Sequence, residues 1–171
     1  GIAGLTAAWM LGPRMDKYDS DGTVNVIPGH SMTFAVLGTL LLAFGWYGFN
    51  VGTAAQFTAD GLANSDVLGR VAMTTTLAMA MGAVGAGVVS LVKNGKVDTL
   101  YVANGLLAGL VGITAIPNTT TWWGALLVGT LAGAQMPIVF EFVEKTLKID
   151  DVCAVFPVHG SAGVLGTPAF P

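Results

Sequence analysis

The stretch SMTFAVLGTLLLAFGWYGFNVGT, residues 31–53, decides the fold class. It contains no charged residue, and it is long enough to cross the hydrocarbon core of a bilayer, which takes about 20 residues in helical form. A strand of a membrane barrel would instead alternate polar and apolar residues over about ten positions, and this stretch does not. The sequence therefore predicts a membrane-spanning helix here.

Further apolar stretches repeat this pattern along the chain. They cover residues 1–11, 67–92, 99–116, 121–143 and 152–167. Of the 171 residues, 53% are hydrophobic and 10% are charged, whereas soluble domains carry roughly a quarter charged residues. The sequence predicts an all-α polytopic membrane protein. Its opening, GIAGLTAAWMLGPR, is typical of the tail of a helix already under way, so we expect the chain to be a fragment.

The basic residues are distributed unevenly between the connections. Alternate connections hold the pairs Arg14 and Lys17, Lys93 and Lys96, and Lys145 and Lys148. The remaining connections hold only Arg70. Because connections on the cytoplasmic side carry the excess of Lys and Arg, the three basic connections are predicted to be cytoplasmic.

Several classes of function have no support in the sequence. A net charge of −3, spread along the chain, does not indicate a nucleic-acid partner. The single cysteine, Cys153, excludes an internal disulfide, and we expect it in the core. No carboxylate or cysteine clusters with His159, so neither a metal site nor a cofactor is predicted. Catalytic triads and nucleotide-binding motifs are also missing, so we expect no enzyme.

One face of the 31–53 stretch combines aromatic rings with a hydroxyl group. Leu42, Trp46, Phe49 and Thr53 follow spacings of four, three and four residues, which place them on one face of a helix. Phe49 and Thr53 belong near its external end. Aromatic faces and a hydroxyl oxygen suit a small cation. The alternative is an aromatic belt at the membrane interface with a threonine at the helix end.

A single histidine, His159, lies within the last apolar stretch, DDVCAVFPVHGSAGVLG (residues 150–166). If a helix begins at Asp150, with Asp150 and Asp151 as N-terminal caps, His159 lies roughly 13 Å into the membrane and shares its face with Val155. Ionisable residues within a membrane usually face a cavity, and a neutral imidazole both donates and accepts a hydrogen bond. The alternative is a packed histidine bonded to a neighbouring carbonyl.

Pairs of glycines four residues apart occur in three of the apolar stretches. They are Gly48/Gly52, Gly105/Gly109 and Gly129/Gly133. Each pair predicts close packing of helices, either in a bundle around a narrow pathway or in ordinary helix contacts within lipid.

Four motifs together resemble the ammonium transporter (Amt/Mep/Rh) family. They are GLTAAWMLGPR, FGWYGFNVGT, NGLLAGLVGIT and DDVCAVFPVHGSAGVLG, in the family's order and at about its spacing. The resemblance implies an eleven-helix subunit whose two five-helix halves are inverted repeats, with the pore between them. The chain then corresponds to the end of helix five through the start of helix ten, which is mostly the second half.

The resemblance also implies roles for individual residues. Trp46 and Phe49 fall on the external aromatic motif, and Phe49 resembles one of two stacked gate phenylalanines. Thr53 falls where the family usually has a serine that helps to hold the ammonium ion. His159 resembles the second of two pore histidines. The first histidine, the helix-five aspartate and the other gate phenylalanine are expected outside this chain.

Three more residues resemble the lining of the family's pore. Leu42 and Val155 correspond to apolar lining, and Thr114 to a residue near the inner part of the pathway. The implied protein is a homotrimer in the cell membrane that transports ammonium or ammonia, with a PII-type regulatory protein at its cytoplasmic face. An ammonium sensor built on the same fold, an Rh-like channel for neutral gas and a truncated gene product remain as alternatives.

Overall fold

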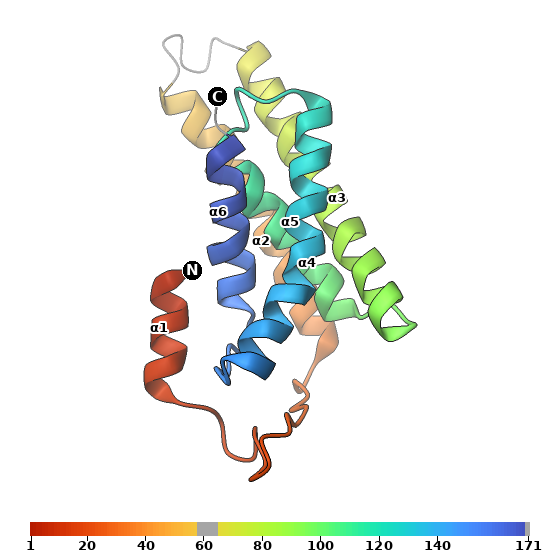
Figure 1. Cartoon of the computed structure of the whole chain (residues 1–171). Helices are drawn as coiled ribbons and strands as arrows, with labels where there is room; N and C mark the ends of the chain where they lie inside the picture. Colours follow the sequence, from red (N-terminus) through yellow and green to blue (C-terminus); the bar gives the residue numbers. More distant parts are fainter. Residues whose placement is uncertain (58–64, 170–171) are drawn as a thin grey trace.

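A computed structural model describes residues 1–57 and 65–169, and within them the regular structure is helical. Apart from the helices, the described residues form one isolated β-bridge, between Tyr18 and Val24. The α-helices are α1 (Ile2–Leu11), α2 (Met32–Phe57), α3 (Ser65–Asn94), α4 (Thr99–Ile113), α5 (Trp122–Glu141) and α6 (Ala162–Gly166), as Figure 1 shows. The π-helical turns η2 (Phe142–Thr146) and η3 (Phe156–Ser161) follow α5 and precede α6, and a short 3₁₀ turn, Thr167–Ala169, follows α6.

Three of the helices have the length and composition of membrane spans. They cover Met32–Gln56, Asp66–Asn94 and Trp122–Thr146, while α1 and α4 are shorter apolar helices. This confirms the predicted fold class, an all-α polytopic membrane protein. The limits of the spans within a bilayer remain predictions.

Glycines allow α3, α4 and α5 to pack against one another at backbone distance. Gly82 of α3 faces Gly109 of α4, where a Cβ on Gly82 would lie 2.9 Å from the Gly109 Cα. On its other side, a Cβ on Gly133 of α5 would lie 2.6 Å from the Gly82 carbonyl carbon. Such contacts leave no space for any larger side chain, and they hold the three helices together by van der Waals packing. A Cβ on Gly48 would meet no described atom within 4 Å.

The remaining helices lie against this three-helix core. α2 packs on α3 and α4 and leaves the apolar side chains of its outer face, Phe44 among them, exposed. The chain's first helix, α1, is connected to α2 by a long segment and stands beside η3 (Figure 1). A Cβ on Gly4 of α1 would meet the Val155 side chain, so the two segments touch closely.

Most of the basic residues gather at one end of the bundle. Lys93 and Lys145 both pair with Glu141, at 2.8 and 3.3 Å. Lys17, which is only 4% exposed, pairs with Glu144 and donates to the Asn25 carbonyl at 3.1 Å. Arg70 lies apart from this group, beside a cavity lined by Trp122 and Trp123 at the start of α5. The basic residues of the alternate connections therefore lie together with their acidic partners at one polar end of the molecule.

Two of the expected stretches have different helical limits in the structure. Continuous helix in the 99–116 stretch ends at Ile113, and turns follow. In the 152–167 stretch the helical turn η3 begins only at Phe156. Ala154, just before it, has a left-handed φ of 55°, which interrupts any helix from Asp150. Pro157 then suits the first turn, since its missing N–H would have no helical partner there.

Candidate functional site

Trp46 of α2 lies at the centre of the candidate site. Its indole Nε1 donates to the Thr114 hydroxyl at 2.9 Å, and this hydroxyl donates to the Leu110 carbonyl at 2.7 Å. The chain of hydrogen bonds connects the ring to the C-terminal end of α4 and satisfies the one polar atom that the indole carries. Trp46 is therefore fixed in orientation by a neighbouring helix.

Two further rings flank Trp46. Phe49 meets it edge to face, with ring centroids 6.0 Å apart and planes at 61°. His159 lies nearly parallel to it, with centroids 6.4 Å apart and planes at 15°. Trp46 and Phe49 lie three residues apart on α2, and His159 comes from the separate turn η3. The three rings thus form one row.

A cavity of about 360 Å³ lies beside this row, between α2, α3 and the end of α4. Phe49, Thr53 and Thr114 line it, together with the buried Asn50, whose amide donates to the Thr75 hydroxyl at 3.1 Å. Hydroxyl and amide groups beside an exposed aromatic ring can accept hydrogen bonds from a small cation and present a π face to it. Thr53 itself is exposed.

The resemblance places Thr114 near the inner part of the pathway and Thr53 at its external end, and both positions stay predictions. In the structure the two residues line the same cavity. The reason is the direction of α4, which begins beside the basic residues Lys93 and Lys96 and so carries Thr114 to its far end.

Leu42 lies at the opposite side of Trp46 from this cavity. It lines, with Trp46 and Phe49, an open apolar depression of about 810 Å³ along the face of α2 that carries Trp46. The spacing therefore does place Leu42, Trp46 and Phe49 along one face of α2. Phe49 lines both the depression and the cavity beside Thr53.

The turn that carries His159 is capped by one aspartate. Both carboxylate oxygens of Asp151 accept backbone hydrogen bonds, from Val155 N and Phe156 N, each at 2.8 Å. This satisfies N–H groups that have no partner within the first turn. Asp151 is therefore a cap, as expected.

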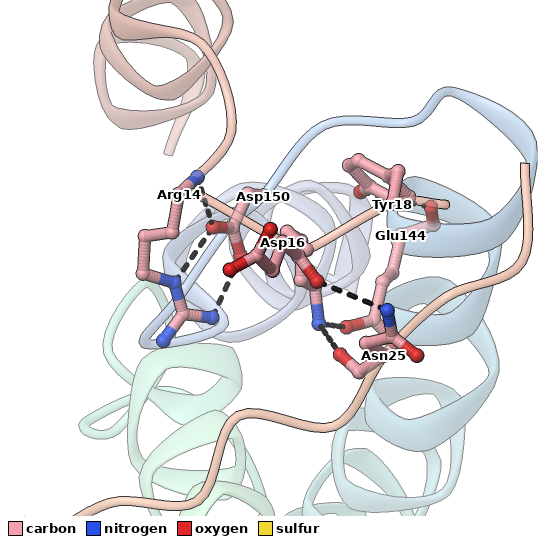
Figure 2. A network of polar contacts seen from close by, with 7 residues as sticks. Arg14, Asp16, Tyr18, Asn25, Glu144 and Asp150 are labelled. Carbon is pink, nitrogen blue, oxygen red and sulfur yellow. Dashed lines mark hydrogen bonds and ion pairs between the residues drawn. The ribbon is translucent and has the colours of Figure 1, made fainter. Parts of the chain in front are cut away.

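Asp150 has a different function from the expected cap. Its carboxylate accepts three hydrogen bonds from Arg14, from the backbone N at 3.0 Å, Nε at 2.7 Å and Nη2 at 2.9 Å (Figure 2). These hydrogen bonds hold the pKa of Asp150 below its usual value, against the effect of burial. Figure 2 shows the pair beside the Tyr18, Asn25 and Glu144 contacts, so the segment after α1 is attached to the segment before η3.

Sequence reasoning missed Gln135 of α5. Its Nε2 donates to the Pro157 carbonyl at 2.9 Å, and the Ser161 hydroxyl donates to its Oε1 at 2.7 Å. A lone amide within an apolar span was the available signal, because polar groups in such spans usually have a defined partner.

Cys153, expected in the core, is exposed. Among the described residues no three His, Cys, Asp or Glu side chains are grouped to hold a metal ion.

The fold and the site together define a class, the polytopic helical membrane proteins, with a row of two aromatic rings and a histidine between α2 and η3, in which Phe49 and His159 are exposed. The model of the Ammonium Transporter Family matches residues 1–170, and the chain belongs to this family.

Relatives cover the same region. The chain is 72% identical over its whole length to ammonium transporter Amt2 of Haloferax mediterranei, of which it spans 39%. A solved structure described as a sensor Amt protein superimposes with a TM-score of 0.88 at 38% identity, over 97% of this chain and 40% of that one. Mep2 of Saccharomyces cerevisiae superimposes with a TM-score of 0.80 at 32% identity, over 95% of this chain and 35% of that one. The chain thus spans about two fifths of the length of these relatives.

Proposed function

We propose that the full-length protein transports ammonium across a membrane, and that this chain supplies one wall of its pathway. The observation that carries the proposal is the row formed by Phe49, Trp46 and His159, which runs from the cavity at Thr53 to the only imidazole in the described spans. The family assignment and the curated names of the relatives support the same substrate.

In this proposal the cation is recruited at the cavity beside Thr53. The face of Phe49 attracts a small cation, and the Thr53 hydroxyl accepts one of its N–H hydrogen bonds. Neither group compensates fully for lost water. A bare cation entering an apolar conduit loses more hydration free energy than such walls return, so the ion gives up its proton to water in the cavity before it passes Phe49. In this proposal the proton crosses separately by way of the His159 imidazole, so that transport carries charge.

His159 then receives the neutral molecule. A neutral imidazole offers one N–H donor and one nitrogen acceptor, which match the lone pair and the N–H groups of ammonia. Val155 lies one turn before it, and Leu42 lies on the α2 side of Trp46, so both are proposed as apolar lining. Thr114 is proposed to act through Trp46, whose indole it holds.

The test is the ammonium-evoked current of the full-length protein on a supported membrane. His159→Ala is expected to abolish the transient current or change its ion selectivity. His30→Ala is the matched control, because His30 is exposed and precedes α2, and its current is expected to equal that of the parent. A parental current in His159→Ala would contradict a pore-lining role for this imidazole.

A sensor is the second candidate, since one similar structure is described as a sensor Amt protein. Saturable ammonium binding without either current or uptake of ammonia would favour the sensor. Uptake of ammonia without current would favour an Rh-like channel for neutral gas.

The proposed assembly follows the family. We propose a homotrimer in the plasma or inner membrane, with the basic end in the cytoplasm, where a PII-type regulatory protein would bind. The charge at that end supports this orientation, because cytoplasmic connections carry the excess of Lys and Arg.

A further inference from the structure

Gln135 is a polar side chain in the middle of α5, an otherwise apolar span. Outside its own helix, Gln135 makes its hydrogen bonds to η3, the turn that carries His159. Its Nε2 donates to the Pro157 carbonyl at 2.9 Å and to the Ala132 carbonyl of its own helix at 2.8 Å. Its Oε1 accepts from the Ser161 hydroxyl at 2.7 Å.

Ser161 closes this arrangement into a ring. Its hydroxyl oxygen lies 2.7 Å from Gln135 Oε1 and 2.9 Å from the Pro157 carbonyl oxygen, and its single hydrogen is shared between these acceptors. Pro157 and Ser161 lie two residues before and two residues after His159. The amide of Gln135 therefore holds the turn at both sides of the imidazole.

The turn needs such support for two reasons. A π-helical turn is rare and has weaker intrinsic preference than an α-helix, and such turns often occur at functional sites. Within a membrane, backbone carbonyls also need partners inside the protein, because no water is available to them. Gln135 supplies a donor to the Pro157 carbonyl, and this bond also fixes the position of η3 along α5.

We infer that Gln135, together with Ser161, is a positioning residue for His159: its amide holds the π-helical turn so that the imidazole stays parallel to Trp46. Gln135 contacts the turn from α5, while the imidazole meets Trp46 of α2 with ring centroids 6.4 Å apart. The consequence for transport rests on the proposed function, whereas the position of the ring can be measured independently.

The transport test uses the full-length protein with Gln135→Leu, which keeps the approximate size of the side chain and removes its hydrogen bonds. The maximal rate of ammonium uptake is expected to fall roughly tenfold, as is typical when a residue that orients a functional group is lost. The KM is expected to stay at the parental value, because the cavity at Phe49 and Thr53 is built from other elements.

Two variants complete the series. Ser161→Ala removes both contacts of the Ser161 hydroxyl but keeps the bond from Gln135 to the Pro157 carbonyl, so it is expected to lower the maximal rate less than Gln135→Leu. It also tests the inference if Gln135→Leu does not fold. Thr130→Ala is the matched control on α5, since the Thr130 hydroxyl donates to the Leu126 carbonyl of its own helix at 2.7 Å. This control is expected to transport like the parent.

Cryo-EM of the parent, Gln135→Leu and Ser161→Ala gives the readout that does not depend on transport. The inference requires the imidazole of His159 to leave its parallel position on Trp46 in Gln135→Leu. An unchanged ring pair in both variants overturns it, as does a displaced ring with a parental maximal rate. If the parent itself transports no ammonium, the proposed function fails, and the displacement of the ring alone then decides the inference.

Discussion

Replacing Gly82 with alanine tests the packing of α3, α4 and α5 most directly. The new Cβ would lie 2.9 Å from the Gly109 Cα, whereas ordinary van der Waals contacts begin at 3.4 Å. The Gly105 carbonyl oxygen would lie closer still, and both neighbouring atoms belong to the backbone of α4, so no side chain can move aside. The helices must separate by roughly half an ångström or more, which loses dispersion contacts along the whole crossing.

The expected magnitude follows from two opposing effects. Overpacking of a well-packed interior costs about 1–3 kcal/mol, and a rigid neighbour places Gly82→Ala toward the upper part of this range. Alanine is favoured over glycine within a helix by about 1 kcal/mol, which offsets part of the cost. We expect Gly82→Ala to lower the free energy of unfolding by about 1–2 kcal/mol.

Gly87→Ala is the matched control on the same helix. Its Cβ would lie 3.5 Å from Val102 Cγ2, an ordinary contact, so only the helix preference remains. This variant is expected to be as stable as the parent or up to about 1 kcal/mol more stable.

The assay is equilibrium unfolding of the full-length protein in mixed micelles with increasing SDS, followed by circular dichroism. Gly82→Ala is expected to unfold at a lower SDS fraction than the parent, and Gly87→Ala at the parental fraction or above it. Unfolding of Gly82→Ala at the parental SDS fraction or above it, or an equal shift of both variants, would refute close packing at this crossing.

Two further predictions concern the polar end and the cavity. Asp150→Asn should lower the free energy of unfolding by about 1–2 kcal/mol at pH 7, because it removes a charged acceptor for Arg14. Arg14 lowers the pKa of Asp150 in the folded state, so this stabilisation is present above the unfolded-state pKa and is lost as the pH falls through the folded-state pKa. Unfolding of the parent and the variant from pH 7 to pH 3 should therefore converge on the acid side, and a constant difference would contradict this. Thr53→Ala should raise the KM for ammonium roughly fivefold at a parental maximal rate, as expected for one lost hydrogen bond to a bound cation. Thr39→Ala, whose hydroxyl bonds the Ala35 carbonyl of its own helix at 3.0 Å, should leave both parameters unchanged.

Periodicity and charge predicted the features that depend on one helix at a time. The spacing of Leu42, Trp46 and Phe49 specifies a helix face, because geometry relates residues three and four apart. The uneven distribution of basic residues likewise follows from the order of the connections. These features require no knowledge of which helix packs on which.

Partners across the bundle were beyond such reasoning. The Trp46–Thr114 bond joins residues 68 positions apart, and Gln135 lies 22 positions from Pro157. No local pattern specifies which polar group meets which. The same limit explains Asp150 and Asp151, adjacent in sequence, of which one caps a turn and the other pairs with Arg14.

The long-range attachment of α1 also has a consequence for synthesis. Arg14 and Asp150 are separated by 136 residues, and ribosomes add roughly 5–20 residues per second, so Arg14 is made roughly 7–27 s before Asp150. The core of α3, α4 and α5, by contrast, forms from consecutive segments that leave the ribosome one after another. The pairing of Arg14 with Asp150 is therefore among the last events in the assembly of the described part of the bundle.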